Sequence, residues 1–170
     1  MDNAEPATDN AEPATDNAEP SPDHAPGLEA AVEVSRAFVG AVAWGEHLRV
    51  WELLGDEGRR IVLRLATRRG MDDALALRIR DGRATSSEMD TFLSDLVNGL
   101  RADLAGADLE NLSYWADPAV AGPSRAWVMM MSPMPAVLGG DVPVGTLDLS
   151  HSEHGWRVER IIPRPRRPPE

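Results

Sequence analysis

Residues able to perform acid–base chemistry are few and widely spaced in this sequence. Asp148 lies between two leucines in a segment of alternating apolar residues. If it points inward, an apolar environment raises its pKa and makes it a candidate general base; if it points outward, it is a solvated carboxylate. His47, at the expected start of a helix, is a candidate proton shuttle or an exposed capping residue. Tyr114, the single tyrosine, lies on an expected strand. These three are the candidates for catalysis.

Other catalytic and metal-binding patterns are absent from the sequence. His151, Glu153 and His154 gather in one turn, but neighbouring ligands on one loop lack the supporting shell of a zinc site, so no metal is predicted. The chain has no cysteine, which excludes disulfides and thiolate chemistry. It also has no Gly-x-Ser-x-Gly elbow and no glycine-rich phosphate loop before a helix. We therefore expect no cofactor.

Tryptophan and methionine share one parity of the segment Arg125–Ser132. Methionine adapts to the shape of a ligand and tryptophan supplies contact area, so this parity indicates either plain core packing or the wall of a pocket for a flat apolar ligand. We expect it to face the helices. The predicted pocket residues are Trp51, Tyr114, Trp127, Met129 and Met131.

The opposite parity of the same segment is also apolar, and it consists of Ala126, Val128 and Met130. A sheet with helices on one side and water on the other alternates apolar with polar residues, so an apolar strand on both parities indicates that both faces are covered. The sequence leaves no helix for the second face. We therefore predict a homodimer through the outer face of the sheet, with these three residues at the interface.

The strands that carry these residues follow a helical first half. Apolar residues at helical spacing predict helices from Leu28 to a stop at Gly45, from Leu48 to Leu54, and from a cap at Asp56 to about Arg69. A fourth helix is expected over Met71–Arg80, capped by Asp72 or Asp73. A capping box at Thr85 and Glu88 begins a fifth helix that extends to Leu104. Beyond Gly106 the period becomes two, which predicts strands near Leu109–Ala116, Arg125–Ser132, Pro143–His151 and Trp156–Pro163. Helices followed by consecutive antiparallel strands predict an α+β domain.

The first 26 residues contain an acidic seven-residue repeat over 2–22, with Asp-Asn-Ala-Glu-Pro-Ala-Thr twice and then Asp-Asn-Ala-Glu-Pro-Ser-Pro, so that every unit has a proline. They carry −7 of the net charge of −11 and no large apolar side chain apart from the initial methionine. A segment with nothing to bury cannot offset its ordering entropy, so we predict a disordered acidic tail over 1–26, a domain over 27–163 and a basic, proline-rich end over 164–170. An acidic chain is a poor candidate for nucleic-acid binding.

Several stretches together resemble one superfamily. They are Ala37-Phe38-Val39, Trp51-Glu-Leu-Leu54, Gly58-Arg59-Arg60, Ala66 to Met71 and the closing Gly155-Trp156-Arg157-Val158. This order resembles the nuclear-transport-factor-2-like superfamily, also called SnoaL-like or the cystatin-like cone fold, in its uncharacterised high-GC bacterial branch. The resemblance covers about residues 28–163. The helix expected over Met71–Arg80 departs from it, because many members have a short hairpin there.

The resemblance implies a curved sheet of about four strands wrapped around the helices, with a conical pocket. The superfamily contains cyclases, dehydratases and an isomerase beside members that only bind, so the fold does not decide between them. We predict a non-catalytic module that binds a small apolar ligand or a protein partner, with an acid–base enzyme as the alternative. The acidic start of the sequence is not a secretory signal and no apolar run reaches membrane-spanning length, which favours a cytoplasmic protein without a membrane partner.

Overall fold

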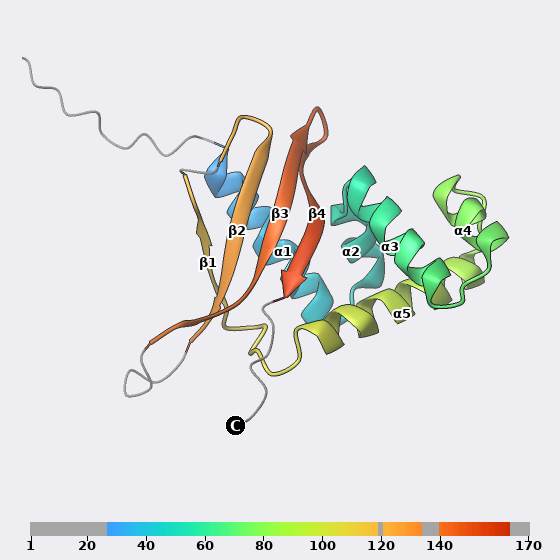
Figure 1. The fold of residues 1–170 in the computed structure, drawn as a ribbon, viewed down its shortest axis with the longest axis horizontal. Helices are drawn as coiled ribbons and strands as arrows, with labels where there is room; N and C mark the ends of the chain where they lie inside the picture. Colours follow the sequence, from blue (N-terminus) through green and yellow to red (C-terminus); the bar gives the residue numbers. More distant parts are fainter. Residues whose placement is uncertain (1–26, 119–120, 134–139, 164–170) are drawn as a thin grey trace, which may run out of the picture.

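The computed structural model describes residues 27–118, 121–133 and 140–163. In this part of the chain five helices precede four strands, which confirms the predicted α+β class (Figure 1). The helices are α1 (Leu28–Trp44), α2 (His47–Leu53), α3 (Asp56–Arg68), α4 (Asp73–Arg80) and α5 (Ser86–Asp103). The strands are β1 (Ser113–Ala116), β2 (Arg125–Ser132), β3 (Val142–Ser152) and β4 (Gly155–Pro163). The predicted tails at 1–26 and 164–170 lie outside the described residues. Among the described helices, none is both long and apolar enough to cross a bilayer.

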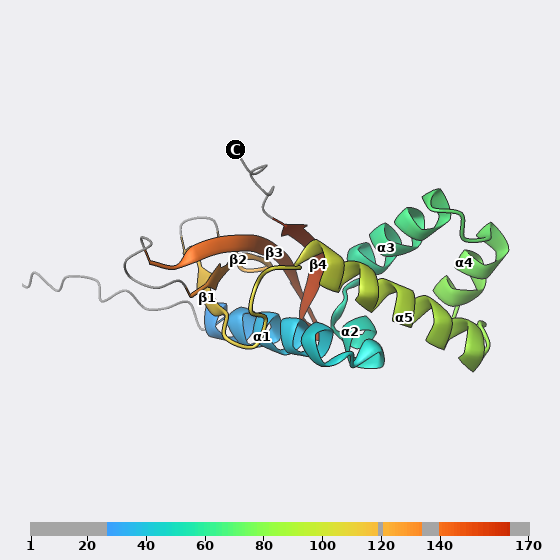
Figure 2. The same cartoon turned by 90° about the horizontal axis from the view of Figure 1, so that it is seen from below.

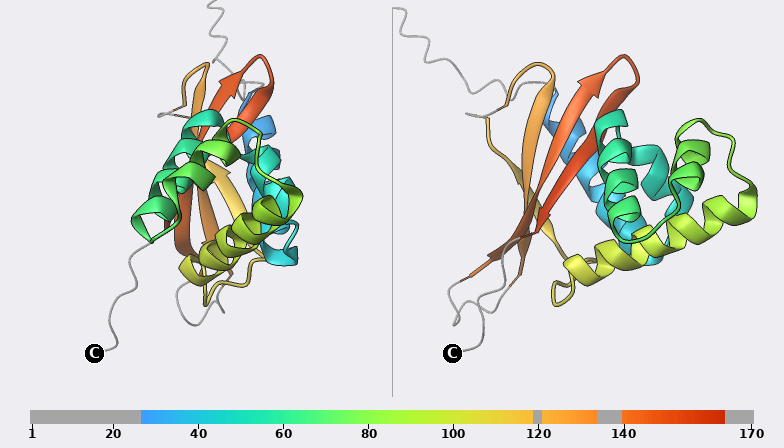
Figure 3. Two further views of the ribbon diagram at one scale, coloured as in Figure 1. Left: turned by 90° about the vertical axis from the view of Figure 1, so that its right-hand side faces the viewer. Right: turned by 45° about the vertical axis from the view of Figure 1, so that its right-hand side comes forward.

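The four strands form one antiparallel sheet in the order β1-β2-β3-β4, so that each strand pairs with its neighbour in the chain. Helix α1 crosses one face of this sheet, which we call the inner face (Figure 2). Helices α3, α4 and α5 extend beyond the β4 edge instead (Figure 3). No helix of the described chain covers the opposite, outer face.

Local sequence signals fix three of the helix ends. Gly45 ends α1 in the left-handed conformation, with φ of 76°, and its N–H donates to α1 carbonyls. The Asp72 side chain accepts a hydrogen bond from the N–H of Leu75 at the start of α4. Thr85 and Glu88 form the predicted capping box of α5, with each side chain accepting from the backbone N–H of the other residue. These three predictions are confirmed.

The start of α3 differs from the prediction. Asp56 is the first helical residue and caps nothing; Gly55 stands at the cap position without a side chain. The acceptor comes from the sheet, because the Glu159 Oε2 atom of β4 accepts from the N–H of Gly58 at 2.7 Å. The Gly55 N–H also donates to the Val158 carbonyl at 2.9 Å. A carboxylate near the positive end of the helix dipole therefore attaches α3 to the sheet.

The main core lies between α1 and the inner face of the sheet. Phe38, Val39 and Val42 of α1 pack there against strand residues with no exposed surface. Residues of α2 and the C-terminal half of α5 complete this cluster. A second, smaller cluster holds α3, α4 and α5 together, and its buried members are Leu63, Ile79, Phe92 and Leu93. Trp51 contacts both clusters.

The two parities of β2 face the opposite way from the prediction. Ala126, Val128 and Met130 are fully buried against α1, so they cannot form a dimer interface on the outer face. Trp127, at 49% exposure, lies on the outer face. Both parities of β2 are apolar, so the pattern did not decide the face; the inner face continues into β3 as Leu147 and Leu149, which pair with Val128 and Ala126 and are fully buried.

Candidate functional site

Asp148 points to the outer face, because Leu147 and Leu149 face α1. It is nevertheless not a solvated carboxylate, since only 7% of its surface is exposed. Arg125 donates a hydrogen bond to Asp148 Oδ2, and this bond raises the pKa of Arg125. The other oxygen, Oδ1, is buried and has no hydrogen-bond partner among the described residues. Asp148 therefore belongs to an ion pair with Arg125 on the outer face of the sheet.

The other two catalytic candidates lie elsewhere. Tyr114 is half-buried on the inner side of β1, and burial raises its pKa to about 12, with the nearby Arg36 guanidinium lowering it only in part. Its hydroxyl thus stays protonated at physiological pH. His47 begins α2, and its Nε2 atom is 3.8 Å from Asp90 Oδ1 on α5. The three candidates therefore occupy three separate places and form no common site.

The predicted pocket residues are also separated. Trp127 and Met129 share the outer sheet face with Trp115, which is paired opposite Met129. Trp51 is instead part of the helical region, where its ring meets Phe92 edge to face at 5.7 Å between centroids and Arg59 stacks over it at 5.0 Å. Tyr114 lies on the inner side, and Met131 is half-buried beyond the irregularity in the pairing of β2 with β3.

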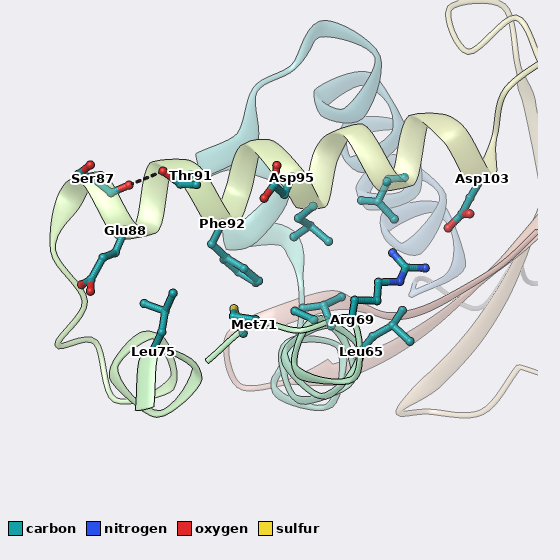
Figure 4. A pocket seen from close by; sticks show the side chains of 15 residues that line it. Leu65, Arg69, Met71, Leu75, Ser87, Glu88, Thr91, Phe92, Asp95 and Asp103 are labelled. Atoms are coloured by element: carbon teal, nitrogen blue, oxygen red, sulfur yellow. Dashed lines mark hydrogen bonds between the residues drawn. The ribbon is translucent and has the colours of Figure 1, made fainter. Parts of the chain in front are cut away.

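A groove that the sequence did not predict lies between α5 on one side and α3 with α4 on the other (Figure 4). Its volume is about 560 Å³. Apolar side chains line most of it, namely Val62, Leu65, Ala66, Met71, Leu75, Phe92, Leu96 and Leu100. The side chain of Leu65 in this lining is 43% exposed, which is high for a large apolar residue. The groove is therefore an apolar surface that the described chain leaves open to solvent.

Polar residues form the rim of the groove. The Arg69 guanidinium extends from the end of α3 toward α5, where a Cβ atom at Gly99 would lie 3.9 Å from its Nη1 atom (Figure 4). Asp95 and Asp103 of α5 line the same groove, and their carboxylates make no hydrogen bond or ion pair with a described residue. At the opposite end, Glu88 is bound by Arg78.

Glu88 differs from the other acids of the rim because it is fully engaged. Its hydrogen bond with Arg78, together with those from the backbone and hydroxyl of Thr85, lowers its pKa to about 2. Glu88 is therefore charged at physiological pH, and its ion pair with Arg78 joins α5 to α4. The charged groups of the lining that remain available to a ligand are Arg69, Asp95 and Asp103.

The sequence contained a weak signal for this groove. The apolar stripe of α5 is longer than a short neighbouring helix such as α4 can cover, and α3 carries an apolar stripe of its own that includes Val62, Leu65 and Ala66. Spacing alone does not show how far apart two packed helices lie, so the groove needed the structure.

In comparisons with known proteins, the chain matches no family model, no curated protein and no solved structure.

Proposed function

We propose that this protein is a non-catalytic binding module whose groove between α3, α4 and α5 takes a small apolar ligand. The observation that carries the proposal is the open apolar groove itself, with its volume of about 560 Å³. Ligand pockets commonly have volumes of about 300–1,000 Å³ and combine an apolar lining with a few polar groups that orient the ligand. Here Arg69, Asp95 and Asp103 would be those groups.

The placement of the ionisable residues supports binding over catalysis. An acid–base enzyme uses groups whose pKa is shifted by burial close to the reacting atoms. The rim acids Asp95 and Asp103 are exposed, and the sequence candidates Asp148, Tyr114 and His47 lie apart from the groove and from one another. A SnoaL-like enzyme stays the alternative, and membership of the nuclear-transport-factor-2-like superfamily stays a proposal that rests on the quoted motifs.

Methionine methyl NMR tests the proposed ligand, with 1-decanol as a neutral apolar probe. Met71 lines the groove, whereas Met129 lies on the sheet, so the two methyl signals report on different surfaces. We expect decanol to shift the Met71 signal in a saturable way and to leave Met129 unchanged. Unchanged Met71 at saturating decanol would refute the proposal.

Two exposed leucines provide a matched pair of variants for this test. Leu65→Glu places a carboxylate in the groove and should weaken decanol binding at least tenfold, because it hydrates the apolar wall. Leu77→Glu changes a leucine of similar exposure on α4, outside the groove lining, and should bind as the parent does. Equal weakening in both variants would show that decanol binds without using the groove.

A second surface supports self-association, and we propose a homodimer through the outer face of the sheet. Trp115 and Trp127 are each about half exposed on that face, and Ile162 of β4 lies in the cross-strand row of Trp115 and Met129. An exposed apolar patch of this kind is typical of an interaction site. Four strands about 4.8 Å apart and β2 with its eight residues give a face of roughly 500 Å². Two copies would bury roughly 1,000 Å², the lower limit for a stable interface.

Sedimentation of the full chain tests the homodimer. Trp127→Glu should convert a dimer into a monomer at tens of micromolar, whereas Trp44→Glu should leave it intact, because Trp44 is an exposed tryptophan on α1 away from the outer face. A parent that is already monomeric refutes the homodimer. Because the groove and the sheet face are separate surfaces, this outcome leaves the groove proposal to its own test.

A further inference from the structure

Glycine occurs at three positions inside the described helices, and only one of them is explained by packing. A Cβ atom at Gly58 would lie 2.7 Å from the Val158 carbonyl oxygen, so that position requires glycine. At Gly99 the nearest atom is 3.9 Å away, and at Gly40 nothing lies within 4 Å. Glycine weakens a helix interior relative to alanine, so an interior glycine without a close neighbour calls for another reason.

Gly40 and Gly99 both line cavities. Gly99 belongs to the groove described above, and Gly40 belongs to a separate cavity of about 330 Å³ beside α1. This second cavity is bounded by α1 and by the segment that leads into β1, where Leu109 and Leu112 contribute apolar walls. Because Gly40 has no side chain, the space over the helix backbone at this position is empty.

Aromatic rings flank this cavity. Trp44 lies one turn after Gly40 on the same helix and is 71% exposed, the largest exposure of any bulky apolar side chain in the described chain. Tyr114 lines the cavity as well, and the Arg36 guanidinium lies over its ring at 5.7 Å from the centroid. The cavity thus combines the exposed indole of Trp44 with the open space over Gly40, which has no side chain. A flat ring fits such a space.

The charges at the cavity favour a cation. Arg36 is neutralised by its ion pair with Glu33, one turn earlier on α1. Glu110 lines the cavity, and its carboxylate makes no ion pair or hydrogen bond with a described residue. The protonated Tyr114 hydroxyl contributes no charge at physiological pH. Among the residues that line the cavity, one carboxylate is therefore left without a counter-ion beside an exposed indole, and such a pair attracts a positively charged nitrogen.

We propose that the cavity over Gly40 is a second binding site, which takes a small planar aromatic molecule carrying a positively charged amine. The ring stacks on Trp44 above Gly40, and the ammonium group pairs with Glu110. This site shares no residue with the groove between α3, α4 and α5, so it is independent of the ligand proposed for that groove.

Three probes with one ring and different charges test the proposal on the full chain: tryptamine, indole and indole-3-acetate. Binding is measured by titration calorimetry and by saturation-transfer NMR. We expect tryptamine to bind about three- to fivefold more tightly than indole, because its ammonium group forms one exposed ion pair with Glu110. Indole-3-acetate should bind most weakly, because its carboxylate is repelled by Glu110. Glu110→Gln should bring tryptamine to the affinity of indole. Tightest binding of indole-3-acetate, or no binding of any probe at millimolar concentration, would overturn the proposal.

Variants of Gly40 and Trp44 test whether the probes bind in this cavity and not elsewhere on the surface. Gly40→Leu fills the cavity with a better helix former, so it should lose all three probes while keeping a thermal midpoint at or above that of the parent. Trp44→Ala removes the stacking surface without touching the core and should weaken every probe at least fivefold. Gly99→Ala, at the other unexplained glycine, should bind tryptamine as the parent does. Parent-like binding by Gly40→Leu or Trp44→Ala contradicts the proposal.

Discussion

The sheet half of the molecule (α1, α2 and the four strands) and the helical half (α3, α4 and α5) are stabilised very differently. The sheet half has one continuous core, in which nineteen buried residues from α1, α2, the end of α5 and the strands form a single cluster. The buried cluster of the helical half has four. Three helices around so small a core leave part of their apolar surface uncovered, and this surface is the groove (Figure 4).

This difference links stability to binding. A region that buries its whole apolar surface has none left for a ligand, whereas a region with a small core keeps apolar surface available at the cost of local stability. The two halves meet at α3, where Glu159 and the backbone of β4 bind the first turn of the helix. We therefore expect the helical half to open locally while the sheet half stays folded.

The largest effect should come from the core of the sheet half. Phe38→Ala removes a ring with no exposed surface at the centre of the main cluster, and it should lower the free energy of unfolding by about 3–5 kcal/mol. Chemical denaturation measures this, and both halves should unfold in one transition because α5 contributes to the same cluster. A loss below 1 kcal/mol would show that the sheet half has no dominant core.

A smaller and more local effect is expected in the helical half. Phe92→Ala removes the partner of Trp51 and one of four buried residues, but its site borders the open groove, so water and neighbouring side chains can enter it. We expect a loss of about 2–3 kcal/mol. Amide exchange should accelerate most in α4 and the first half of α5. Uniform acceleration across β2, β3 and β4 would contradict the division into two halves.

The junction between the halves is tested by Gly58→Ala. The added methyl group would lie 2.7 Å from the Val158 carbonyl oxygen, so α3 must move away from β4 and weaken its bond to Glu159. We expect a loss of about 1–3 kcal/mol. Gly99→Ala is the control, because it meets no close atom and should gain up to about 1 kcal/mol. Equal stability of the two variants would show that the junction tolerates displacement.

The smallest effect concerns pH. Because the folded pKa of Glu88 is lowered to about 2, its bonds to Arg78 and Thr85 stabilise the fold fully above its unfolded value, near 4.5, and are lost as the pH falls toward 2. Glu88→Gln should therefore melt below the parent at pH 7 and approach it between pH 4.5 and 2. Thermal melts over this range measure the difference. A gap that stays constant with pH would exclude the ionised carboxylate as its source.

The sequence predicted the elements well where the signals are local. Gly45, Asp72 and the Thr85–Glu88 box act within one helical turn, and each is found at the end it was assigned to. The faces of β2 were predicted wrongly, because a strand that is apolar on both parities does not show which parity meets the helix. The cap of α3 was missed because its acceptor, Glu159, is 101 residues away in the chain.

The candidate site was not predictable from single residues. Asp148 takes the outward one of the two orientations that the sequence left open, but it is not solvated, because its ion pair with Arg125 depends on the register of β2 with β3. The groove depends on how closely α3 and α4 approach α5, which the periodicity of each helix does not encode. Sequence patterns therefore described which surfaces are apolar, and tertiary packing decided which of them stay open.

The position of the helical half in the chain has a consequence for folding kinetics. Residues 45–112 separate α1 from β1, so the contacts between α1 and the sheet close a long loop, whereas the sheet itself is a meander with local pairings (Figure 1). Such distant contacts raise the contact order and slow folding. The rate-limiting step should be the docking of α1 onto a preformed meander. Shortening the helical half would then speed folding only slightly, because the entropy of loop closure changes with the logarithm of loop length.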